Sequence, residues 1–574
     1  MKVNLRWQIL LAVLGFALVL SLLSLTVPRE VASGTVVPGE VAPGSAVCQA
    51  QVPVRGGVFA EGFVGVPRYL NPLLSDGNPV DREISALLFD GLTRYDALGQ
   101  LVPDLGSWVV GEDGRTVRFA LFEGKQWHDG EPVTAVDVVY TYSLMQDEAF
   151  SGSPDLKTLW QSVTINQIDA MTVEFVLSEP YAPFLAATTR GLLPAHLLQG
   201  VTAVSLPNHP FNNAPVGTGP LRVDETVSWR ENGRLRLLPS PAVWPQGVQL
   251  DAIDYRFYPD EATMLADFAA GTLQAVNHLP DSALPEMAAL PQARLFTARD
   301  ERYTTLLFNV TNSAQGGVNT VEMRRSLAVG LNRDLLVDRV LQGQGIVFEG
   351  PYLPSSWAYQ PDLLTQYGDG DRETAVSQLE IQGWVLLADG GPRQKEGALL
   401  QLRLAALEQQ QPIAAEVARQ WAEIGVGVEL TLLPDVASLR SVLAERAFDV
   451  ALFDVVLGGD PDLYDFWSQE AMVRGQNYAG WNNRRASESL ESARQLWSVA
   501  ERRPFYDTFL RLFDNDLPAF SLYQHVHTYA VRSEVEKLDI GQIRTPRDRY
   551  HTLADWFMLY ENVVIACPTD AVSR

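Results

Sequence analysis

The sequence predicts an α/β protein whose folded part consists of lobes, and the pattern of apolar residues in each half supports this. Residues 400–404 alternate like a strand, residues 413–424 have apolar side chains at helical spacing, and residues 426–430 alternate again. In the other half, residues 92–178 contain hairpin signals such as Asp113-Gly114 before an alternating stretch. The 574 residues are enough for several domain-sized units. No repeat of about 30–50 residues is present, which disfavours a solenoid or propeller.

The first elements of the folded part follow from local patterns. A strand is expected from Gly56 to Phe63, after a body that begins near Arg55. A helix with apolar residues on one face at 84–88 comes next, and we expect Gly91 to end it. A further helix is expected near residues 135–145, between antiparallel strands.

The later part of the chain predicts a sheet with a ligand-binding edge. Residues 434–446 have the pattern of a helix, and residues 448–456 form a nearly continuous apolar run, typical of a strand in the buried middle of a parallel sheet. Such sheets bind ligands in loops beyond the carboxyl ends of their strands. The loop in question is Leu-Gly-Gly-Asp-Pro-Asp-Leu-Tyr at 457–464.

The N-terminus predicts a membrane segment and a tether. Lys2 and Arg6 precede an apolar run over residues 9–27, close to the ~20 residues that span a bilayer. Residues 1–27 are therefore a membrane anchor or a signal segment, and the length of the run, greater than in most cleaved signal peptides, favours the anchor while leaving cleavage open. The basic residues predict that the remainder is extracytoplasmic. Residues 28–54 have the composition of a flexible linker.

Charge and cysteine content exclude several classes of protein. The formal net charge is −25, and no basic cluster compensates for it, so nucleic-acid binding is not expected. Cys48 and Cys567 are too few for a disulfide framework or a four-thiolate metal site. They lie just outside the two ends of the folded part, so a disulfide between them is an open alternative that geometry decides.

Motifs for catalysis and cofactor binding are missing from the sequence. Gly343-Gln344-Gly345 starts like a dinucleotide loop but follows a helical pattern, which favours a helix cap. Acidic residues at 369–380 echo a calcium loop, but an N-cap before a helix ending at Gly383 explains them better. His525 and His527 would share one face of a strand, and no third ligand accompanies them. We therefore expect a binding protein without catalytic residues, metal or cofactor.

The chain also resembles the family 5 extracellular solute-binding proteins of ABC importers, which include oligopeptide, dipeptide and nickel receptors. The resemblance covers about residues 55–545, and its strength lies in an ordered set of short motifs rather than in any one of them. The motifs are Gly56-Gly57, Leu70-Asn71-Pro72, Leu101-Val102-Pro103-Asp104-Leu105, Trp127-His128-Asp129-Gly130-Glu131-Pro132-Val133, Asp137-Val138-Val139-Tyr140-Thr141, Pro215-Val216-Gly217-Thr218-Gly219-Pro220, the segment 324–333, Gly350-Pro351, Ser356-Trp357-Ala358-Tyr359 and Asp460-Pro461-Asp462.

The resemblance implies a two-lobed clamshell of the class II periplasmic-binding-protein type, with an extra domain on the N-terminal lobe and two crossings between lobes. It places lobe I at residues 55–86, 213–300 and 522–562, the extra domain at 87–212, lobe II at 301–521 and a C-terminal tail at 563–574. Cys48 and Cys567 would then lie at the two ends of one lobe.

The function implied is that of an extracytoplasmic receptor that captures a peptide, oligosaccharide or similar solute and delivers it to an ABC permease, as a monomer. Peptide receptors of this family hold the peptide's ammonium with an aspartate at the position of Leu457, which argues against a free peptide unless Asp460 or Asp462 substitutes. Aromatic side chains would form walls for the ligand. The expected ligand-binding residues are Tyr69, Asn71, Thr218, Asn309, Trp357, Asp460, Asp462, Trp467 and Tyr478.

Two other classes of function stay open on the sequence. A receptor of the same fold could signal to a membrane sensor rather than feed a permease. A hydrolase is disfavoured because no nucleophile and base can be recognised together.

Overall fold

A computed structural model describes residues 47–96, 99–244, 247–311, 317–367, 370–386, 391–540 and 546–566. Residues 55–559 form one compact unit. The described residues outside it, 47–54 and 560–566, belong to a second unit.

The second unit contains a strand pair, β1 (Val47–Val54) with β21 (Leu559–Ala566). Residues 47–54 form strand β1, which corrects the expectation that they belong to a flexible linker. Strand β21 likewise extends into the expected C-terminal tail, as far as Ala566. The expected anchor at 1–27, the remaining linker residues and Cys567 lie outside the described residues, as does the side chain of Cys48. None of the helices within the described ranges is long and apolar enough to cross a membrane.

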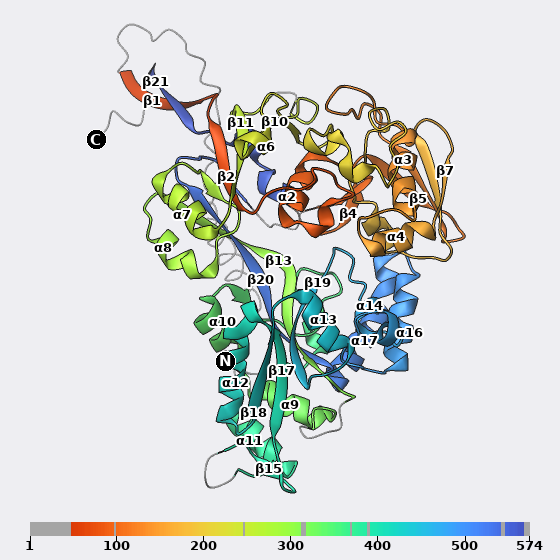
Figure 1. Cartoon of the computed structure of the whole chain (residues 1–574), viewed down its shortest axis with the longest axis vertical. Coiled ribbons are helices and arrows are strands. Elements are labelled where there is room, and N and C mark those ends of the chain that lie inside the picture. The colour runs from red at the N-terminus through yellow and green to blue at the C-terminus, as the bar shows by residue number, and fades with distance from the viewer. Residues whose placement is uncertain are drawn as a thin grey trace, which may run out of the picture. The chain divides into compact units, whose positions relative to one another are not determined.

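One large mixed sheet runs through the compact unit, and two long strands form its middle. These are β13 (Ala293–Phe308) and β20 (Ala519–Arg532), which pair antiparallel and lie side by side in Figure 1. Their register shifts between Arg299 and Tyr303, so the ladder is irregular there. The sheet order is β18-β17-β19-β13-β20-β12-β2-β11-β10-β9, with β14 beside β20.

Buried apolar side chains fall into two sets along the chain. One set draws on residues 59–287 and 529–556, which we call the first lobe. The other draws on residues 303–523, which we call the second lobe. Ala293, Leu295 and Phe296 of β13 pack against the first set, whereas its residues from Tyr303 onward belong to the second. Since β20 also contributes to both sets, β13 and β20 are the two connections between the lobes.

The first lobe surrounds one end of the sheet and carries an antiparallel layer. Its helix α2 begins behind Asn78, whose side chain accepts a hydrogen bond from the Val80 N–H. Helix α3 begins with a reciprocal capping box of Thr134 and Asp137. Its elements are β2 (Val58–Val64), α2 (Pro79–Leu88), β3 (Thr93–Tyr95), β4 (Leu101–Pro103), β5 (Gly106–Val110), β6 (Thr116–Leu121), α3 (Ala135–Gln146), α4 (Pro154–Gln161), β7 (Thr164–Gln167), β8 (Thr172–Val176), α5 (Phe184–Ala187), β9 (Leu221–Val223), α6 (Trp229–Asn232), β10 (Arg234–Pro239), β11 (Ala252–Tyr258), α7 (Glu261–Ala270), β12 (Ala275–Val276) and α8 (Leu284–Ala288), with short 3-10 turns such as η7 (Pro546–Tyr550).

The second lobe is built on a strand–helix–strand unit. β17 and β18 pair in parallel, and α12 joins them. Its elements are α9 (Val321–Val329), α10 (Arg333–Leu341), β14 (Gly345–Ile346), α11 (Arg372–Ile381), β15 (Gln394–Lys395), β16 (Ala398–Leu399), β17 (Gln401–Leu407), α12 (Gln411–Glu423), β18 (Gly427–Leu433), α13 (Val436–Ala444), β19 (Val450–Val456), α14 (Tyr464–Trp467), α15 (Ala471–Arg474), α16 (Arg484–Arg494) and α17 (Val499–Asp516).

Several predicted elements are confirmed and a few are wrong in detail. The strand–helix–strand unit, the hairpin of β5 and β6, and the N-cap of α11 by Asp371 are present. Residue Gly343 follows the end of α10, as a cap would. Helix α2 ends at Leu88 rather than at Gly91, and β19 is parallel only to β17, since its other neighbour β13 is antiparallel.

Candidate functional site

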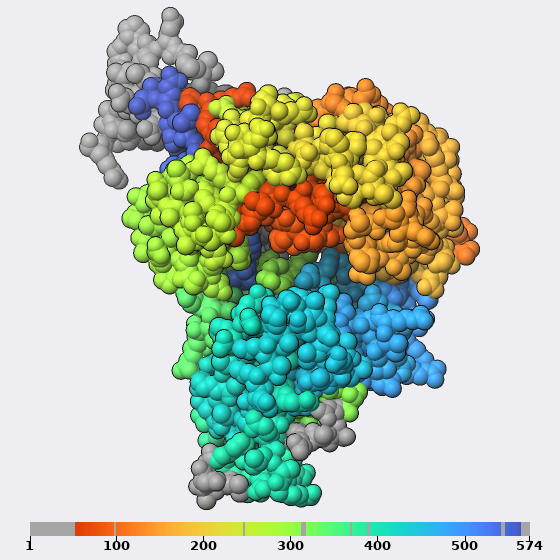
Figure 2. Space-filling view, in the orientation of Figure 1, coloured from red at the N-terminus to blue at the C-terminus, as the bar shows by residue number. Residues whose placement is uncertain are grey.

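A pocket of about 780 Å³ lies between the two lobes. The first lobe supplies most of its lining, from the segment around α2 and β3, from residues 186–191 and from η7. The second lobe supplies Gly458 and Gly459, and the crossing strand β13 supplies Glu301. Figure 2 shows the surface hollowed beside the red segment that contains α2. Pockets of this size hold small organic ligands in many proteins.

One end of the pocket is acidic. Asp90 and Asp104 are both buried, and both form ion pairs with Arg547, at 3.6 Å for Asp104. Arg94 lies farther from Asp104, at 3.8 Å, and is half exposed. Burial, and then the like charge of Asp90, raise the pKa of Asp104 to about 7. The neighbouring cations therefore compensate the two carboxylates only in part.

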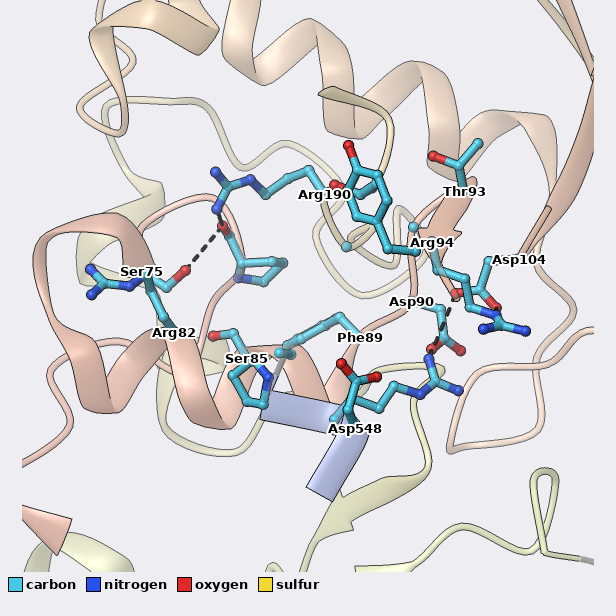
Figure 3. Close-up of a pocket in the computed structure, with 18 of the residues that line it drawn as sticks. Ser75, Arg82, Ser85, Phe89, Asp90, Thr93, Arg94, Asp104, Arg190 and Asp548 are labelled. Atoms are coloured by element: carbon cyan, nitrogen blue, oxygen red, sulfur yellow. Dashed lines mark hydrogen bonds and ion pairs between the residues drawn. The ribbon is translucent and has the colours of Figure 1, made fainter. Parts of the chain in front are cut away.

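The other end of the pocket contains two arginines and acidic side chains. Arg190 holds Asp76 in a bidentate pair at 2.8 and 3.1 Å. Arg82 is exposed and donates to the backbone oxygen of Asp76 at 2.6 Å. Figure 3 shows Arg82 on one side of the pocket and Asp90, Arg94 and Asp104 on the opposite side. Glu83, which follows Arg82 in α2, also lines the pocket and is paired with Arg549.

Between the two ends, the wall contains a buried hydroxyl without a partner. Ser85 in α2 is 4% exposed, and its Oγ has no hydrogen-bond partner within the described part of the chain. Ser85 lines the pocket, and Phe89 lies beside it in Figure 3. A buried hydroxyl that lacks a partner loses free energy unless a ligand or water supplies one.

A buried cluster behind the pocket fixes η7 against α2. Arg549 forms ion pairs with Glu61 at 3.2 Å and with Glu83 at 2.7 Å. Tyr550 donates to Glu61 and contacts Tyr255 at 2.6 Å between the hydroxyl oxygens. Burial raises the pKa of Glu61, and Arg549 opposes that rise. This cluster positions the segment that carries Arg547.

The lobes touch directly at one side of the pocket. The ring of Tyr95 lies against Gly459, where a Cβ would come within 2.0 Å of Tyr95 Cε1. Burial raises the pKa of Tyr95, and the charges of Asp460 and Glu301 add to the rise. Only a residue without a side chain allows this approach.

A second interlobe contact joins residues 114–182 to α16 and the segment after it. The Ala182 N–H donates to the Arg494 carbonyl at 2.7 Å, and the Arg494 guanidinium lies 5.0 Å from the centre of the Tyr181 ring. Trp497 Nε1 donates to the Gly114 carbonyl at 3.0 Å. Both contacts therefore join the first lobe to the second.

The two aspartates expected to bind ligand are in ion pairs. Asp460 binds Arg502 through two hydrogen bonds at 2.6 and 2.7 Å. Asp462 binds Arg494 at 2.5 and 3.1 Å, and burial raises its pKa while Arg494 opposes the rise. Leu457 is buried, with 5% of its surface exposed.

Three expected polar residues hold backbone segments together. The Asn71 side-chain Nδ2 donates to Asn212 Oδ1 at 2.9 Å, and the Asn71 side-chain oxygen Oδ1 accepts from the Leu73 N–H. Thr218 accepts from the Asp90 N–H at 3.0 Å, next to the acidic end of the pocket. Asn309 donates to two carbonyls of the loop before β19.

The four expected aromatic residues pack in four places. Trp467 is buried against the neighbouring rings of Trp481 and Phe513. The Trp357 ring packs on Tyr506, and Tyr478 packs on Phe453. The Tyr69 ring lies beneath the Arg68 guanidinium at 5.0 Å. Among the described residues that line the pocket, none of the nine expected ones is present.

Histidines form a pair that the sequence did not indicate. His527 faces His278 at 3.4 Å between their Nδ1 atoms, whereas His525 contacts Thr304 Oγ1 at 2.8 Å and Asp454 at 3.8 Å. Burial lowers the pKa of His527 to about 3. Within the described ranges, no three His, Cys, Asp or Glu side chains gather in a way that could hold a metal ion.

Residues 100–474 match the family described as "Bacterial extracellular solute-binding proteins, family 5 Middle". The chain belongs to this family. It is 24% identical to the oligopeptide-binding protein AppA of Bacillus subtilis (strain 168), over 90% of this chain and 94% of the relative. It is 23% identical to the dipeptide-binding protein of Escherichia coli (strain K12), over 87% and 93% respectively.

Solved structures agree on the fold. The ABC transporter substrate-binding protein CtaP of Listeria monocytogenes superposes with a TM-score of 0.73, at 20% identity, over 88% of this chain and 99% of CtaP. The fold is therefore the two-lobed α/β clamshell that the motifs predicted. As a member of this family, the protein is an extracytoplasmic substrate-binding protein of ABC import and not an enzyme.

Proposed function

We propose that this protein captures a peptide or a solute of similar chemistry in the 780 Å³ pocket between its lobes and presents it to an ABC permease. The observation that carries the proposal is that both lobes and the crossing strand β13 contribute to one pocket. A ligand that touches both sides favours the form in which the lobes are together. The names of two relatives, an oligopeptide- and a dipeptide-binding protein, support the ligand class.

The proposed mechanism is a shift in population toward the closed form. The contacts of Tyr95 with Gly459 and of Trp497 with Gly114 are available only when the lobes approach each other. A ligand with micromolar affinity supplies about −8 kcal/mol, part of which offsets the cost of bringing the lobes together. The permease then recognises the closed protein.

We propose that the ligand-binding part is monomeric and is tethered by residues 1–27, with residues after the apolar run 9–27 outside the membrane. We further propose that Cys48 and Cys567 form a disulfide. The pairing of β1, which contains Cys48, with β21, which ends one residue before Cys567, supports this. Mass spectrometry without reductant would then show the two cysteine peptides joined, and cell fractionation would recover the protein with membranes.

A ligand screen tests the function. The full-length protein is heated with free di- to tetrapeptides, oligosaccharides and metal–histidine complexes, and we expect a raised melting temperature with at least one compound. Retention of radiolabelled ligand by cells with the intact gene, and loss of uptake on its deletion, would connect binding to import. A screen without a single thermal shift would contradict the proposal. Neither the oligopeptide- nor the dipeptide-binding relative supports a signalling receptor.

A further inference from the structure

Two residues at the end of α16 join the second lobe to the antiparallel layer of the first. Arg494 is the last residue of α16, and its carbonyl accepts a hydrogen bond from the Ala182 N–H at 2.7 Å. Trp497 donates from Nε1 to the Gly114 carbonyl at 3.0 Å and packs against the apolar core of the first lobe. In Figure 1, α16 lies next to this layer, apart from the place where β13 and β20 pass between the lobes. A rotation of the lobes about these two strands would therefore separate the contact.

The side chain of Arg494 also reaches from one lobe to the other. Its guanidinium lies 4.2 Å from the centre of the Tyr464 ring in its own lobe and 5.0 Å from the centre of the Tyr181 ring in the first lobe. Its Nη2 is 3.5 Å from the hydroxyl oxygen of Tyr181. A planar guanidinium can stack on aromatic rings and hold a carboxylate at the same time, which an ammonium group cannot do as well.

Asp462 holds this guanidinium in place. Its Oδ2 accepts hydrogen bonds from Arg494 Nη2 and Nε at 2.5 and 3.1 Å. Asp462 belongs to the loop after β19, and Gly458 and Gly459 of the same loop line the pocket. One loop thus lines the pocket and fixes the arginine that reaches the first lobe. Because the charge of Arg494 is paired within the second lobe, separating the lobes leaves no buried charge without a partner, and the contact can open and close.

We propose that these residues form a latch, in which Arg494, positioned by Asp462, stabilises the closed form without contacting the ligand. The latch consists of Gly114, Tyr181, Ala182, Asp462, Arg494 and Trp497. None of the six is among the described residues that line the pocket, so the latch acts on an empty pocket as well as on a filled one. A measurable fraction of the ligand-free protein is therefore closed. This inference rests on the proposed function and adds the residues that set the balance between the two forms.

The test measures the distance between the lobes by double electron–electron resonance in the full-length protein, dialysed free of solutes. Spin labels are attached at two exposed positions, through Asp155→Cys in α4 and Arg511→Cys in α17. Cys48→Ser and Cys567→Ser leave these as the only two thiols. We expect two populations of distances, of which the shorter belongs to the closed form.

Three variants remove parts of the latch. Arg494→Lys keeps a charge opposite Asp462 but loses the planar group that lies near the two tyrosine rings. Tyr181→Leu removes the ring of the first lobe and leaves the ion pair intact. Each should lower the ratio of closed to open form at least threefold, and Asp462→Asn should do the same because Arg494 is no longer held.

A combination and a control complete the series. Arg494→Lys with Tyr181→Leu should lower the ratio little more than either alone, because both remove one contact. Arg484→Lys is the matched control, since it makes the same substitution in the same helix, where the side chain is 82% exposed and pairs with Glu488 at 2.7 Å. It should leave the ratio unchanged.

Three results would overturn the latch: a ligand-free protein that is entirely open, variants whose distances match those of Arg484→Lys, and effects of Arg494→Lys and Tyr181→Leu that simply add. Circular dichroism checks that each variant is folded. If a variant at Arg494 or Asp462 is not, Tyr181→Leu decides the question, because it leaves the buried ion pair in place. No ligand is used in these measurements, so the thermal screen decides solute binding whatever their outcome.

Discussion

Asp460 and Asp462 each have an arginine of their own, whereas Asp90 and Asp104 share Arg547. The first two lie in the loop after β19, where the sequence suggested a ligand. Their short ion pairs instead tie this loop to the helices that follow it. Asp104 also has Arg94 at 3.8 Å, and its pKa is nevertheless raised because it is buried beside Asp90.

Removal of Asp460 from the loop after β19 should cause the largest change in the free energy of unfolding. Asp460→Ala leaves Arg502 unpaired in a position where its side chain is 4% exposed. The free energy of unfolding should fall by about 3–5 kcal/mol, measured by urea denaturation. Asp362→Ala, at an exposed position, should change it by less than about 0.5 kcal/mol. An equally small change for Asp460→Ala would show that the ion pair is not structural.

Ionisation of Asp104 should make the folded protein less stable as pH rises. Its pKa is about 7 in the folded protein and 3.8 for an unperturbed aspartate, so the folded state binds more protons between these limits. Stability is therefore lost as pH increases from about 4 to 7, on the order of 1–4 kcal/mol, and levels off above that. In denaturation series across this range, Asp104→Asn should lack this component. The same slope in the variant would assign it to other groups.

A substitution at Gly459, where the loop after β19 meets the first lobe, should have a smaller effect. This effect is on ligand affinity rather than on stability. Gly459→Ala places a methyl group against the Tyr95 ring, so the lobes cannot close fully. We expect about tenfold weaker binding, by titration, of a ligand that the thermal screen identifies, since closure energy is lost. Gly391→Ala is the control, because nothing lies within 4 Å of its added carbon and Gly391 does not line the pocket. If both variants bind alike, the Tyr95 contact does not limit closure.

The smallest effect concerns the contact beside Arg494. Trp497→Phe keeps an aromatic ring and removes the Nε1 hydrogen bond to Gly114, which is worth about 0.5–1.5 kcal/mol. Affinity for the same probe should fall about two- to tenfold with no change in the binding stoichiometry. Unchanged affinity would indicate that this contact is also made in the open form.

The sequence was a good guide to elements and a poor one to the pocket. Helices α3 and α12 could be predicted because caps and apolar spacing are local properties of the chain. The pocket could not, since Arg547 meets Asp90 across 457 residues of chain. No pattern near either residue indicates that contact.

The aspartates at 460 and 462 show the converse case. Their motif is conspicuous in the sequence, but the arginines that neutralise them come from α16 and α17, 32 and 42 residues farther on. The sequence also does not indicate that the Ser85 hydroxyl has no partner among the described residues, because this depends on what α2 faces.

Strand β20, which both lobes share, determines how late during synthesis the fold can be completed. It pairs with β13 along both lobes and with β12 of the first lobe, and the segment that carries Arg547 and Arg549 follows it. Neither lobe can therefore close its hydrogen-bond ladder until more than about nine-tenths of the chain has been made, so contacts between distant residues dominate the folding of the body. A nascent chain stopped before residue 519 would keep the edges of β13 and β12 without their partner, exposed to aggregation.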